Sequence, residues 1–396
     1  MSLHTMTSRE RVMAALSHQE PDRIPRDLGG TPTTSIHIKA HSKLKGFLGL
    51  EGGAEEVDSH PGQTAVVDPR IALRVGADCV ALKAKPSAKW RLHLSTDDRG
   101  YERYTDEWGV VRACPPEGFF YDIVSSPLAE AGLTDIDRFP WPDPMDPGRL
   151  EGMADLAKSL YEGTDKCIIL SIDTSLFAQI GYMMGWEPFL ISLAINQPLI
   201  REFVERLLEF NLRLVTAALD QVGKYVQVFY LADDLTHQCN LFASKNTLND
   251  IFMPAYRKLI AAVKSKAGLK ILFHICGASR LLFEELISVG VDAFNPVQVA
   301  ADGMDDTDAL KRMFGDRLTF WGGGCDTQRI LSYGTTEEVR QEVRRRIADL
   351  APGGGFVFCP VHNIQSEVPP ENIVAVYDEV SRWDRYPIHV EELRGQ

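Results

Sequence analysis

Short apolar runs recur eight times along the chain, and longer segments with a helical repeat separate most of them. In residues 198–222, for example, Ile200, Phe203 and Leu207 follow the 3.6-residue period of an amphipathic helix. Most of the short runs are continuously apolar rather than alternating, which is typical of parallel strands buried on both faces. The predicted strands are residues 23–28, 78–83, 166–172, 225–231, 270–273, 292–296, 318–321 and 356–359.

Helices predicted between these strands complete a repeating strand–helix pattern. They are residues 35–47, 148–161, 176–195, 198–222, 247–266, 280–289, 305–314, 337–350 and 369–383. Eight strand–helix units predict an α/β protein built as a (β/α)8 TIM barrel, in which functional groups gather where the strands end. A doubly wound open sheet is the alternative, but no Gly-x-Gly-x-x-Gly segment follows any strand. The barrel is therefore favoured.

Two segments lie outside this pattern. Thr7 and Glu10 have the spacing of a capping box and predict a short helical extension before the first strand. Residues 86–147 replace the strand–helix rhythm with predicted hairpin strands at 90–94 and 101–111, followed by a proline-rich stretch. This part has too little apolar sequence for a core of its own. We therefore expect a β-rich, proline-rich insertion or lid after the second strand, within a single domain of 396 residues.

Charge and cysteine content narrow the class of protein. A net charge of −13 argues against nucleic acid or an anionic membrane as the main partner, because such partners need a basic surface. No apolar run approaches the roughly 18 residues of a membrane span, and the charged start has no signal-peptide core. Seven cysteines spread over a long chain do not suggest a disulfide framework. These features predict a reduced, cytoplasmic protein.

Ionisable and metal-binding side chains follow five consecutive predicted strands. They are Asp233, Asp234 and His237 after the fourth strand, His274 and Cys276 at the fifth, Asn295 and Gln298 at the sixth, Cys325 and Asp326 after the seventh, and Cys359 and His362 at the eighth. Taken singly, strand-end Asp and Asn residues often cap loops, and an isolated cysteine is more often a core residue than a ligand. Their concentration at one predicted rim favours a functional site.

Two chemistries suit this rim. In the first, His274 and Cys276 project from the same face of an extended strand and bind zinc together with Cys359, which leaves a fourth position open. A substrate thiol bound there would lose its proton to the charge of the metal, which suits methyl or alkyl transfer. In the second, Asp233 and Asp234 act without a metal, by stabilising a protonated intermediate or delivering a proton.

Several motifs resemble the uroporphyrinogen decarboxylase superfamily, whose other branch holds cobalamin-linked methyltransferases such as methylcobamide:coenzyme M methyltransferase. The motifs are the opening Thr-Ser-Arg-Glu-Arg-Val-Met-Ala-Ala-Leu at residues 7–16, Glu-Pro-Asp-Arg-Ile-Pro at 20–25, Leu-Ala-Asp-Asp at 231–234, His-Ile-Cys-Gly at 274–277, Gly-Thr-Thr-Glu-Glu at 334–338 and Pro-Pro-Glu-Asn-Ile at 369–373. The resemblance runs nearly the full length of the chain and implies a TIM barrel.

The methyltransferase branch is implied by the His274-x-Cys276-Gly segment, which resembles the first half of a His-x-Cys…Cys zinc motif. Cys359 matches the third ligand in position, while Cys325 has the Gly-Cys context of the motif one strand earlier, and His362 is a further alternative. The resemblance thus implies zinc, with a corrinoid (cobalamin) carried by a partner protein as co-substrate and a small-molecule methyl donor or acceptor.

Further roles are expected for the other residues of the rim. Asp233, Asp234 and His237 would orient substrate or protons, and Asn295, Gln298, Asp326 and His362 would line the substrate site.

Two other functions stay open. The decarboxylase branch carries an arginine-rich segment after the first strand that grips the carboxylates of its substrate, whereas only Arg23 and Arg26 lie nearby here. Cofactor-free decarboxylation of a tetrapyrrole is therefore the enzymatic alternative. The non-enzymatic alternative is a corrinoid or tetrapyrrole carrier in which His237 or His362 is an axial ligand.

Overall fold

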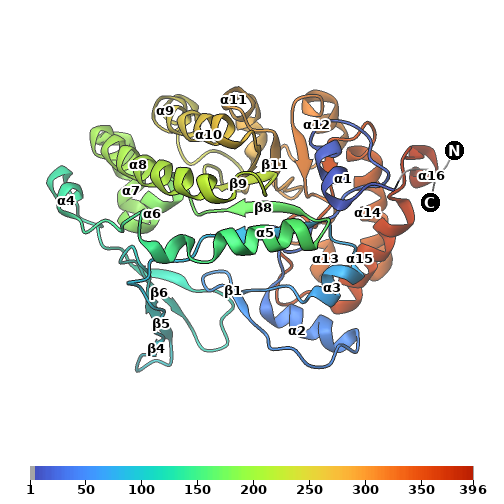
Figure 1. Cartoon of the computed structure of the whole chain (residues 1–396), viewed down its shortest axis with the longest axis horizontal. Coiled ribbons are helices and arrows are strands. Elements are labelled where there is room, and N and C mark those ends of the chain that lie inside the picture. The colour runs from blue at the N-terminus through green and yellow to red at the C-terminus, as the bar shows by residue number, and fades with distance from the viewer. Residues whose placement is uncertain (1–4, 396) are drawn as a thin grey trace.

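The computed structural model describes residues 5–395, and its centre is a curled, seven-stranded parallel sheet surrounded by helices (Figure 1). The strands are β3 (Cys79–Lys83), β8 (Cys167–Ser171), β9 (Val228–Ala232), β10 (Lys270–His274), β11 (Ala293–Asn295), β12 (Thr319–Trp321) and β13 (Phe356–Val357). Neighbours in the sheet follow one another in this order, and every pairing is parallel. Seven of the predicted strands are thus confirmed.

The predicted first strand, 23–28, forms no regular strand. Arg26 makes a single parallel bridge to Phe358, and the N–H of Asp27 donates to the Phe358 carbonyl at 2.8 Å. On the other side, the N–H of Asp78 donates to the carbonyl of Arg26 at 2.7 Å. The segment therefore links the two edges of the sheet. Pro25 has no N–H to donate, and the N–H of Arg26 bonds to the Asp78 carboxylate instead of a strand, so the ladder is short.

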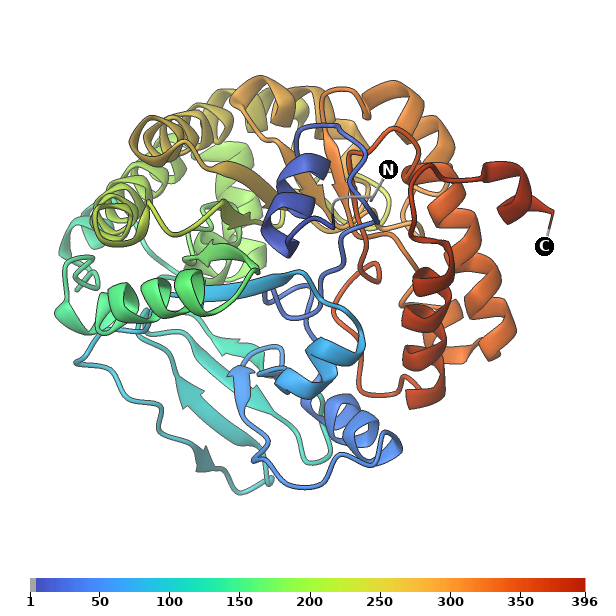
Figure 2. The same cartoon turned by 45° about the vertical axis from the view of Figure 1, so that its right-hand side comes forward.

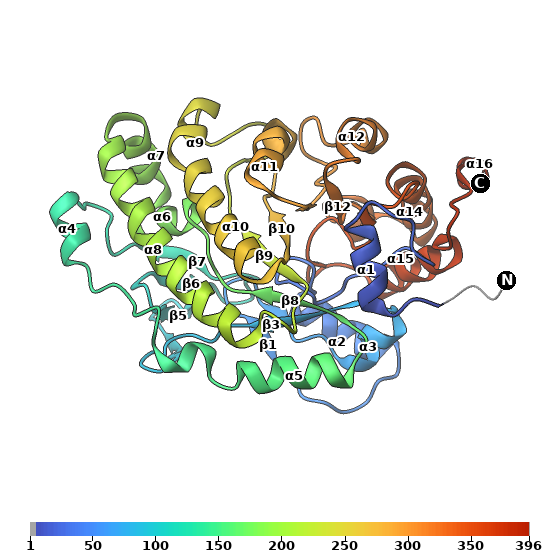
Figure 3. The same cartoon turned by 45° about the horizontal axis from the view of Figure 1, so that its top comes forward.

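Helices surround the sheet on its outer side (Figures 1 and 3). The longer ones are α1 (Ser8–Ala15), α2 (Ile38–Phe47), α5 (Met153–Gly163), α6 (Phe177–Met184), α7 (Trp186–Ile195), α8 (Gln197–Val222), α10 (Met253–Ala267), α12 (Thr307–Phe314), α14 (Thr336–Leu350) and α15 (Pro370–Trp383). Shorter ones are α3 (Pro69–Arg74), α4 (Leu133–Arg138), α9 (Lys245–Ile251), α11 (Phe283–Val289), α13 (Ile330–Tyr333) and α16 (Val390–Arg394). Within residues 5–395, none of the helices is long and apolar enough to cross a membrane.

Two of the predicted helices are broken in the structure. The prediction of one helix over 176–195 was wrong, because Gly185 adopts a φ of +82° and separates α6 from α7. The helix predicted at 247–266 is interrupted at Phe252, one residue before Met253-Pro254 begins α10.

The region 86–147 contains a four-stranded antiparallel sheet, β4 (Ser95–Thr96), β5 (Glu102–Thr105), β6 (Val111–Cys114) and β7 (Asp122–Ser125). The hairpin strand predicted at 90–94 is wrong, since β4 begins at Ser95. Figure 2 shows this sheet across the molecule from the C-terminal helices. It is attached to the N-terminal part of the chain, where a ring nitrogen of His37 hydrogen-bonds the Phe119 carbonyl at 3.1 Å. A lid function stays a prediction.

Apolar side chains that alternate along the strands fill the inside of the curled sheet. This inner cluster consists of Val12, Ala15, Leu16, Cys79, Cys167, Ile169, Val228, Tyr230, Leu272, Ala293, Trp321, Val357 and Cys359. Val12 and Ala15 belong to α1 and Leu16 follows it directly, so the N-terminal helix closes the end of the sheet where the strands begin. The opposite end, where the strands finish, is left for polar groups.

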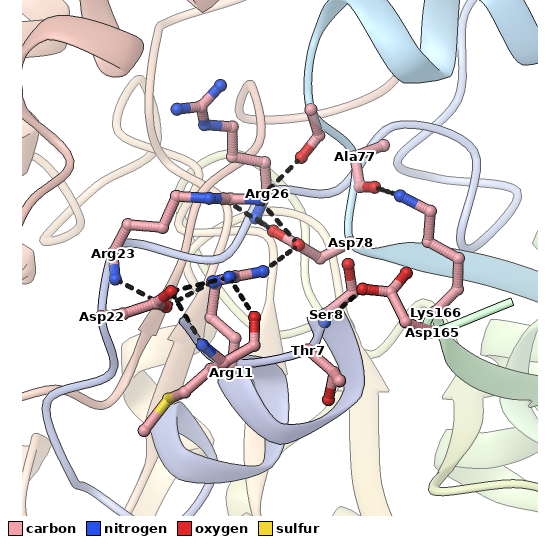
Figure 4. Close-up of polar contacts among 12 residues, drawn as sticks. Thr7, Ser8, Arg11, Asp22, Arg23, Arg26, Ala77, Asp78, Asp165 and Lys166 are labelled. Carbon is pink, nitrogen blue, oxygen red and sulfur yellow. Dashed lines mark hydrogen bonds and ion pairs between the residues drawn. The ribbon is translucent and has the colours of Figure 1, made fainter. Parts of the chain in front are cut away.

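Buried ion pairs hold this N-terminal closure in place (Figure 4). Asp78 is fully buried at the start of β3 and accepts hydrogen bonds from Arg11 at 2.7 Å and from Arg23 at 2.8 and 2.9 Å. Arg11 also pairs with Asp22 at 2.6 Å, and the guanidinium of Arg26 pairs with Asp384. These arginines are therefore bound to carboxylates at the end of the sheet away from the polar strand ends.

Candidate metal centre

A histidine and a cysteine stand together at the carboxyl end of β10. His274 is the last residue of the strand, and its Nε2 lies 3.2 Å from the Sγ of Cys276. The chain turns immediately afterwards at Gly277, where φ is +94° and a Cβ would lie 2.4 Å from the backbone oxygen of His237. Only glycine fits this turn, which fixes the direction of Cys276. The side-by-side placement predicted for His274 and Cys276 is observed.

A second imidazole completes a cluster that can hold a metal ion. His362 lies in the loop after β13, and its ring centroid is 5.2 Å from that of His274. The ligand atoms of His274, Cys276 and His362 all lie within 4.8 Å of one another. His274 is buried, and the other two are half-buried.

Side-chain amides orient both imidazoles. The Nδ1 of His274 lies 2.5 Å from the Oδ1 of Asn295, and the Nδ1 of His362 is bonded to the Oδ1 of Asn363. The amide of Asn295 is itself fixed, because its Nδ2 donates to the Trp321 carbonyl at 2.8 Å and its Oδ1 accepts from the Thr33 hydroxyl at 3.2 Å. An Oδ1 acceptor requires a proton on Nδ1, which leaves Nε2 of each ring as the free lone pair.

Burial disfavours the charged forms of the cluster's side chains. Burial, followed by the charge of nearby His362, lowers the pKa of His274 to about 3. Burial, followed by the charge of Asp234, raises the pKa of the Cys276 thiol far above its usual range. A bound cation would reverse the second effect, since a thiol that coordinates a metal gives up its proton.

The cluster forms part of the wall of a cavity of about 410 Å³ at the ends of the strands. Its lining comes from the loop at Pro32 and Thr33, from the segment after β8 and from the ends of β9 and β10. Polar residues of this lining are Thr33, Ser59, Ser171, Asp173, Thr174, Ser175, Tyr182, Tyr230, Asp233 and Asp234. Neither lysine nor arginine contributes to it among residues 5–395.

The two adjacent carboxylates after β9 have different environments. Asp233 is buried and accepts hydrogen bonds from the N–H groups of Leu176, Phe177 and Ala178 at 2.7–2.9 Å and from the Tyr256 hydroxyl at 2.5 Å. Its carboxylate therefore anchors the start of α6, although the residue also contributes to the cavity lining. Among the described residues, the carboxylate of Asp234 has no hydrogen-bond or ion-pair partner. Burial, followed by the charge of Asp233, raises the pKa of Asp234 to about 6.

Other predicted site residues lie elsewhere. Cys359 was preferred as third ligand, but it is fully buried in the inner cluster of the sheet and is absent from the group of close ligand atoms. Cys325 is also fully buried and lies outside this group. Of the three alternatives for the third ligand, the group of close ligand atoms therefore contains His362 and neither cysteine.

Three further residues that were predicted for the site do not belong to the group of close ligand atoms. His237 is exposed and packs on Phe242, and the carboxylate of Asp326 accepts the N–H of Gln328 in its own loop. Gln298 accepts the N–H of Gly277 at 2.7 Å and so supports the turn after Cys276.

Sequence reasoning missed several residues of the cavity. Ser171 is the last residue of β8, Asp173, Thr174 and Ser175 follow this strand, and Tyr182 lies on α6. The polar segment directly after the predicted strand at 166–172 was the available signal for Asp173, Thr174 and Ser175. Asn363, which orients His362, had no such signal because its role depends on the path of the loop.

The sequence and the fold of this chain are similar to those of known proteins. A model of the uroporphyrinogen decarboxylase (URO-D) family matches residues 124–383. The uroporphyrinogen decarboxylase of Psychromonas ingrahamii is 31% identical over 151 residues, which are 37% of this chain and 40% of that protein. The uroporphyrinogen decarboxylase of Alkalilimnicola ehrlichii is 26% identical over 284 residues, which are 68% of this chain and 70% of that protein.

Among solved structures, a methyltransferase from Methanosarcina mazei superposes with a TM-score of 0.65 at 14% identity, covering 95% of this chain and 99% of that one. At this identity the likeness shows the fold. Fold and site together define an α/β protein with a curled parallel sheet and a candidate metal centre at its strand ends. The chain belongs to the uroporphyrinogen decarboxylase family.

Proposed function

We propose that this member of the family is a zinc-dependent methyltransferase. His274, Cys276 and His362 hold the metal, and a methyl group moves between a corrinoid and a thiol. The observation that carries the proposal is the convergence of these three ligand atoms within 4.8 Å at the wall of the strand-end cavity. The likeness in fold to a methyltransferase supports it.

The residues suit zinc in number and kind. Two imidazole nitrogens and one thiolate are common ligands of zinc, and three protein ligands leave the open fourth position of a catalytic site. Tetrahedral geometry at zinc requires about 3.6 Å between a nitrogen and a sulfur ligand, and Nε2 of His274 is 3.2 Å from Sγ of Cys276. The amides on both Nδ1 atoms are the outer partners that metal-binding histidines require.

Bound zinc would lower the pKa of a thiol that coordinates to it, so that the thiolate is available at neutral pH. Side chains of the protein orient the metal ligands and accept the proton. Asn295 and Asn363 hold the imidazoles, and Asp233 holds the start of α6 beside the cavity. Asp234 is the free carboxylate of this cavity and takes the proton that a thiol gives up when its sulfur coordinates the metal. A corrinoid would supply the methyl group: the Co–C bond would break as the S–C bond forms, and the electron pair would stay on cobalt.

The corrinoid would be presented by a partner protein at the open end of the strands. We also propose that the segment at residues 23–28 counts as the eighth strand of a closed barrel, because its backbone bonds to both edges of the sheet. Such closure would leave the strand ends as the natural entrance to the site.

Decarboxylation of a tetrapyrrole is the second candidate, favoured by the names of the matched relatives. A substrate with many carboxylates needs guanidinium partners. Arg23 and Arg26, the arginines near the predicted first strand, pair with Asp78 and Asp384 at the opposite end of the sheet. This distribution of charge favours the methyltransferase.

The test combines metal content with activity. The purified wild type, supplied with zinc under reducing conditions, should hold about one zinc per chain and transfer methyl from methylcobalamin to a thiol. Cys276→Ala should lose both properties, whereas Cys239→Ala, which removes an exposed cysteine, should keep both. Uroporphyrinogen decarboxylation by both the wild type and Cys276→Ala, without bound metal, would overturn the proposal.

A further inference from the structure

A second cavity meets the candidate metal centre from the other part of the rim. Its volume is about 580 Å³, and its lining consists of Cys276, Gln298, Thr327, Gln328, Val361, His362, Gln365 and Glu367. Cys276 and His362 also line the first cavity, whereas His274 lines only the first. The metal-binding cluster therefore stands between the two cavities.

The two cavities occupy different sectors of the sheet. The first lies over the ends of β8, β9 and β10, and the second over the loops that follow β11, β12 and β13. Each cavity thus gives a separate approach to the cluster, with Cys276 and His362 as the shared part of the two linings. Direct transfer of a group between two reactants is faster when both are held beside each other in this way.

The lining of the second cavity is rich in hydrogen-bond acceptors. Gln365 uses its Nε2 to donate to the backbone and side-chain oxygens of Asn363, both at 2.9 Å. Within residues 5–395, no protein donor is hydrogen-bonded to its Oε1. Glu367 has no ion-pair partner in that range, and its only hydrogen bond comes from the Ser366 hydroxyl at 3.1 Å. The side-chain amide of Gln328 is likewise unpaired there.

No cation of the described chain lines this cavity. The ammonium of Lys43 donates to the Ser366 carbonyl at 2.9 Å and lies outside the lining, as does Arg329, which follows Gln328 in sequence. A sulfonate, carboxylate or phosphate would therefore meet the Glu367 carboxylate with no ammonium or guanidinium in the lining to compensate its charge. An ammonium group would meet a carboxylate and amide oxygens that accept its protons.

We propose that the second cavity binds the thiol reactant through a cationic tail, so that the substrate class is an aminothiol whose sulfur reaches Cys276 and His362. This inference rests on the proposed function, because it places the sulfur on the metal. Glu367 and Gln365 are then the residues of the second cavity that determine specificity. Anionic thiols are not preferred substrates.

The test uses three thiols of the same length that differ only in the tail: cysteamine, 2-mercaptoethanol and 2-mercaptoethanesulfonate. Their binding is measured on the full chain loaded with cobalt(II) in place of zinc, by the thiolate-to-cobalt absorption band. Cysteamine should bind at least about tenfold more tightly than the sulfonate, with the neutral thiol between them.

Glu367→Gln should weaken cysteamine about five- to tenfold and leave 2-mercaptoethanol within about twofold. Glu371→Gln removes an exposed carboxylate outside the lining and should change neither. Coordination of the metal by the amine would not depend on Glu367, so the variant separates that effect from binding in the cavity.

The outcomes distinguish the two proposals. Failure of the wild type to bind either metal overturns the proposed function and this inference together. Metal binding with equal affinity for the three thiols, or with the sulfonate preferred, overturns the inference alone. A preference for cysteamine that Glu367→Gln does not reduce overturns the assignment to the second cavity.

Discussion

Replacement of Asn295 by leucine tests how the protein prepares His274 for a metal. Asn295 is fully buried, and its Oδ1 lies 2.5 Å from Nδ1 of His274. Leucine keeps the approximate volume but removes the acceptor that holds the proton on Nδ1. Without it, the ring can rotate or present the wrong tautomer to the metal.

The expected loss follows from the bonds that disappear. Removal of an outer partner of a metal-binding histidine typically weakens metal binding about 10- to 100-fold, which corresponds to about 1.4–2.7 kcal/mol. Asn295 also donates to the Trp321 carbonyl at 2.8 Å, so a further cost of about 1–3 kcal/mol falls on the stability of the fold.

Competition with a chelator of known affinity measures the zinc dissociation constant, and urea unfolding measures stability separately. Asn372→Leu is the matched control, because Asn372 is a buried asparagine that bonds to the carbonyls of Leu331 and Gly334. It should lose stability but keep its zinc affinity. The reasoning is refuted if Asn295→Leu folds and binds zinc within twofold of the wild type.

Three further predictions concern stability, pH and the third ligand. Asp78→Asn leaves Arg11 and Arg23 without their shared buried carboxylate. We expect the free energy of unfolding, measured with urea, to fall by about 3–5 kcal/mol while metal affinity stays unchanged. A decrease below about 1 kcal/mol would contradict this expectation. Burial raises the pKa of Asp27 to about 6 from its ordinary 3.8, so the folded state holds this proton more tightly and stability falls as pH rises from about 4 through 6. Urea unfolding at pH 5 and pH 8 measures the difference in free energy of unfolding between Asp27→Asn and the wild type. This difference should shift in favour of the variant at pH 8, by up to about 3 kcal/mol. An equal difference at the two pH values would refute the raised pKa of Asp27 as the cause. His362→Ala should bind zinc at least about tenfold more weakly while Cys359→Ala does not, as chelator competition would show, and the reverse order would restore Cys359 as the third ligand.

Much of the fold follows from the apolar pattern, because strands buried on both faces need continuous apolar runs. The strand predicted at 270–273 is β10, Lys270–His274, and the strand predicted at 78–83 is β3, Cys79–Lys83. The break between α6 and α7 was less visible. The residues on both sides of Gly185 have the apolar pattern of a helix, and only the backbone conformation of this glycine separates the two helices.

The pair His274 and Cys276 could be predicted because it depends only on the two-residue period of a strand and the glycine that ends it. The third ligand could not. Alternation places Cys359 on the inner face, but the depth of a side chain inside a curled sheet depends on the stagger between strands. His362 reaches the cluster because of the path of its loop, which no local pattern records.

The roles of the two aspartates show the same limit. Asp233 and Asp234 look equivalent in the sequence, yet one accepts N–H groups of a segment 55–57 residues earlier in the chain and the other stays free. Only the packing of α6 against the end of β9 separates the anchoring carboxylate from the one that faces the cavity.

The most direct test of the account is the X-ray absorption spectrum of the zinc-loaded protein at the zinc edge. We expect one sulfur ligand at about 2.3 Å and two imidazole nitrogens at about 2.0–2.1 Å, with a light atom in the fourth position. In Cys276→Ala the sulfur should disappear. Two sulfur ligands in the wild type would return Cys359 or Cys325 to the site, and a zinc with no sulfur ligand would contradict the metal centre described here.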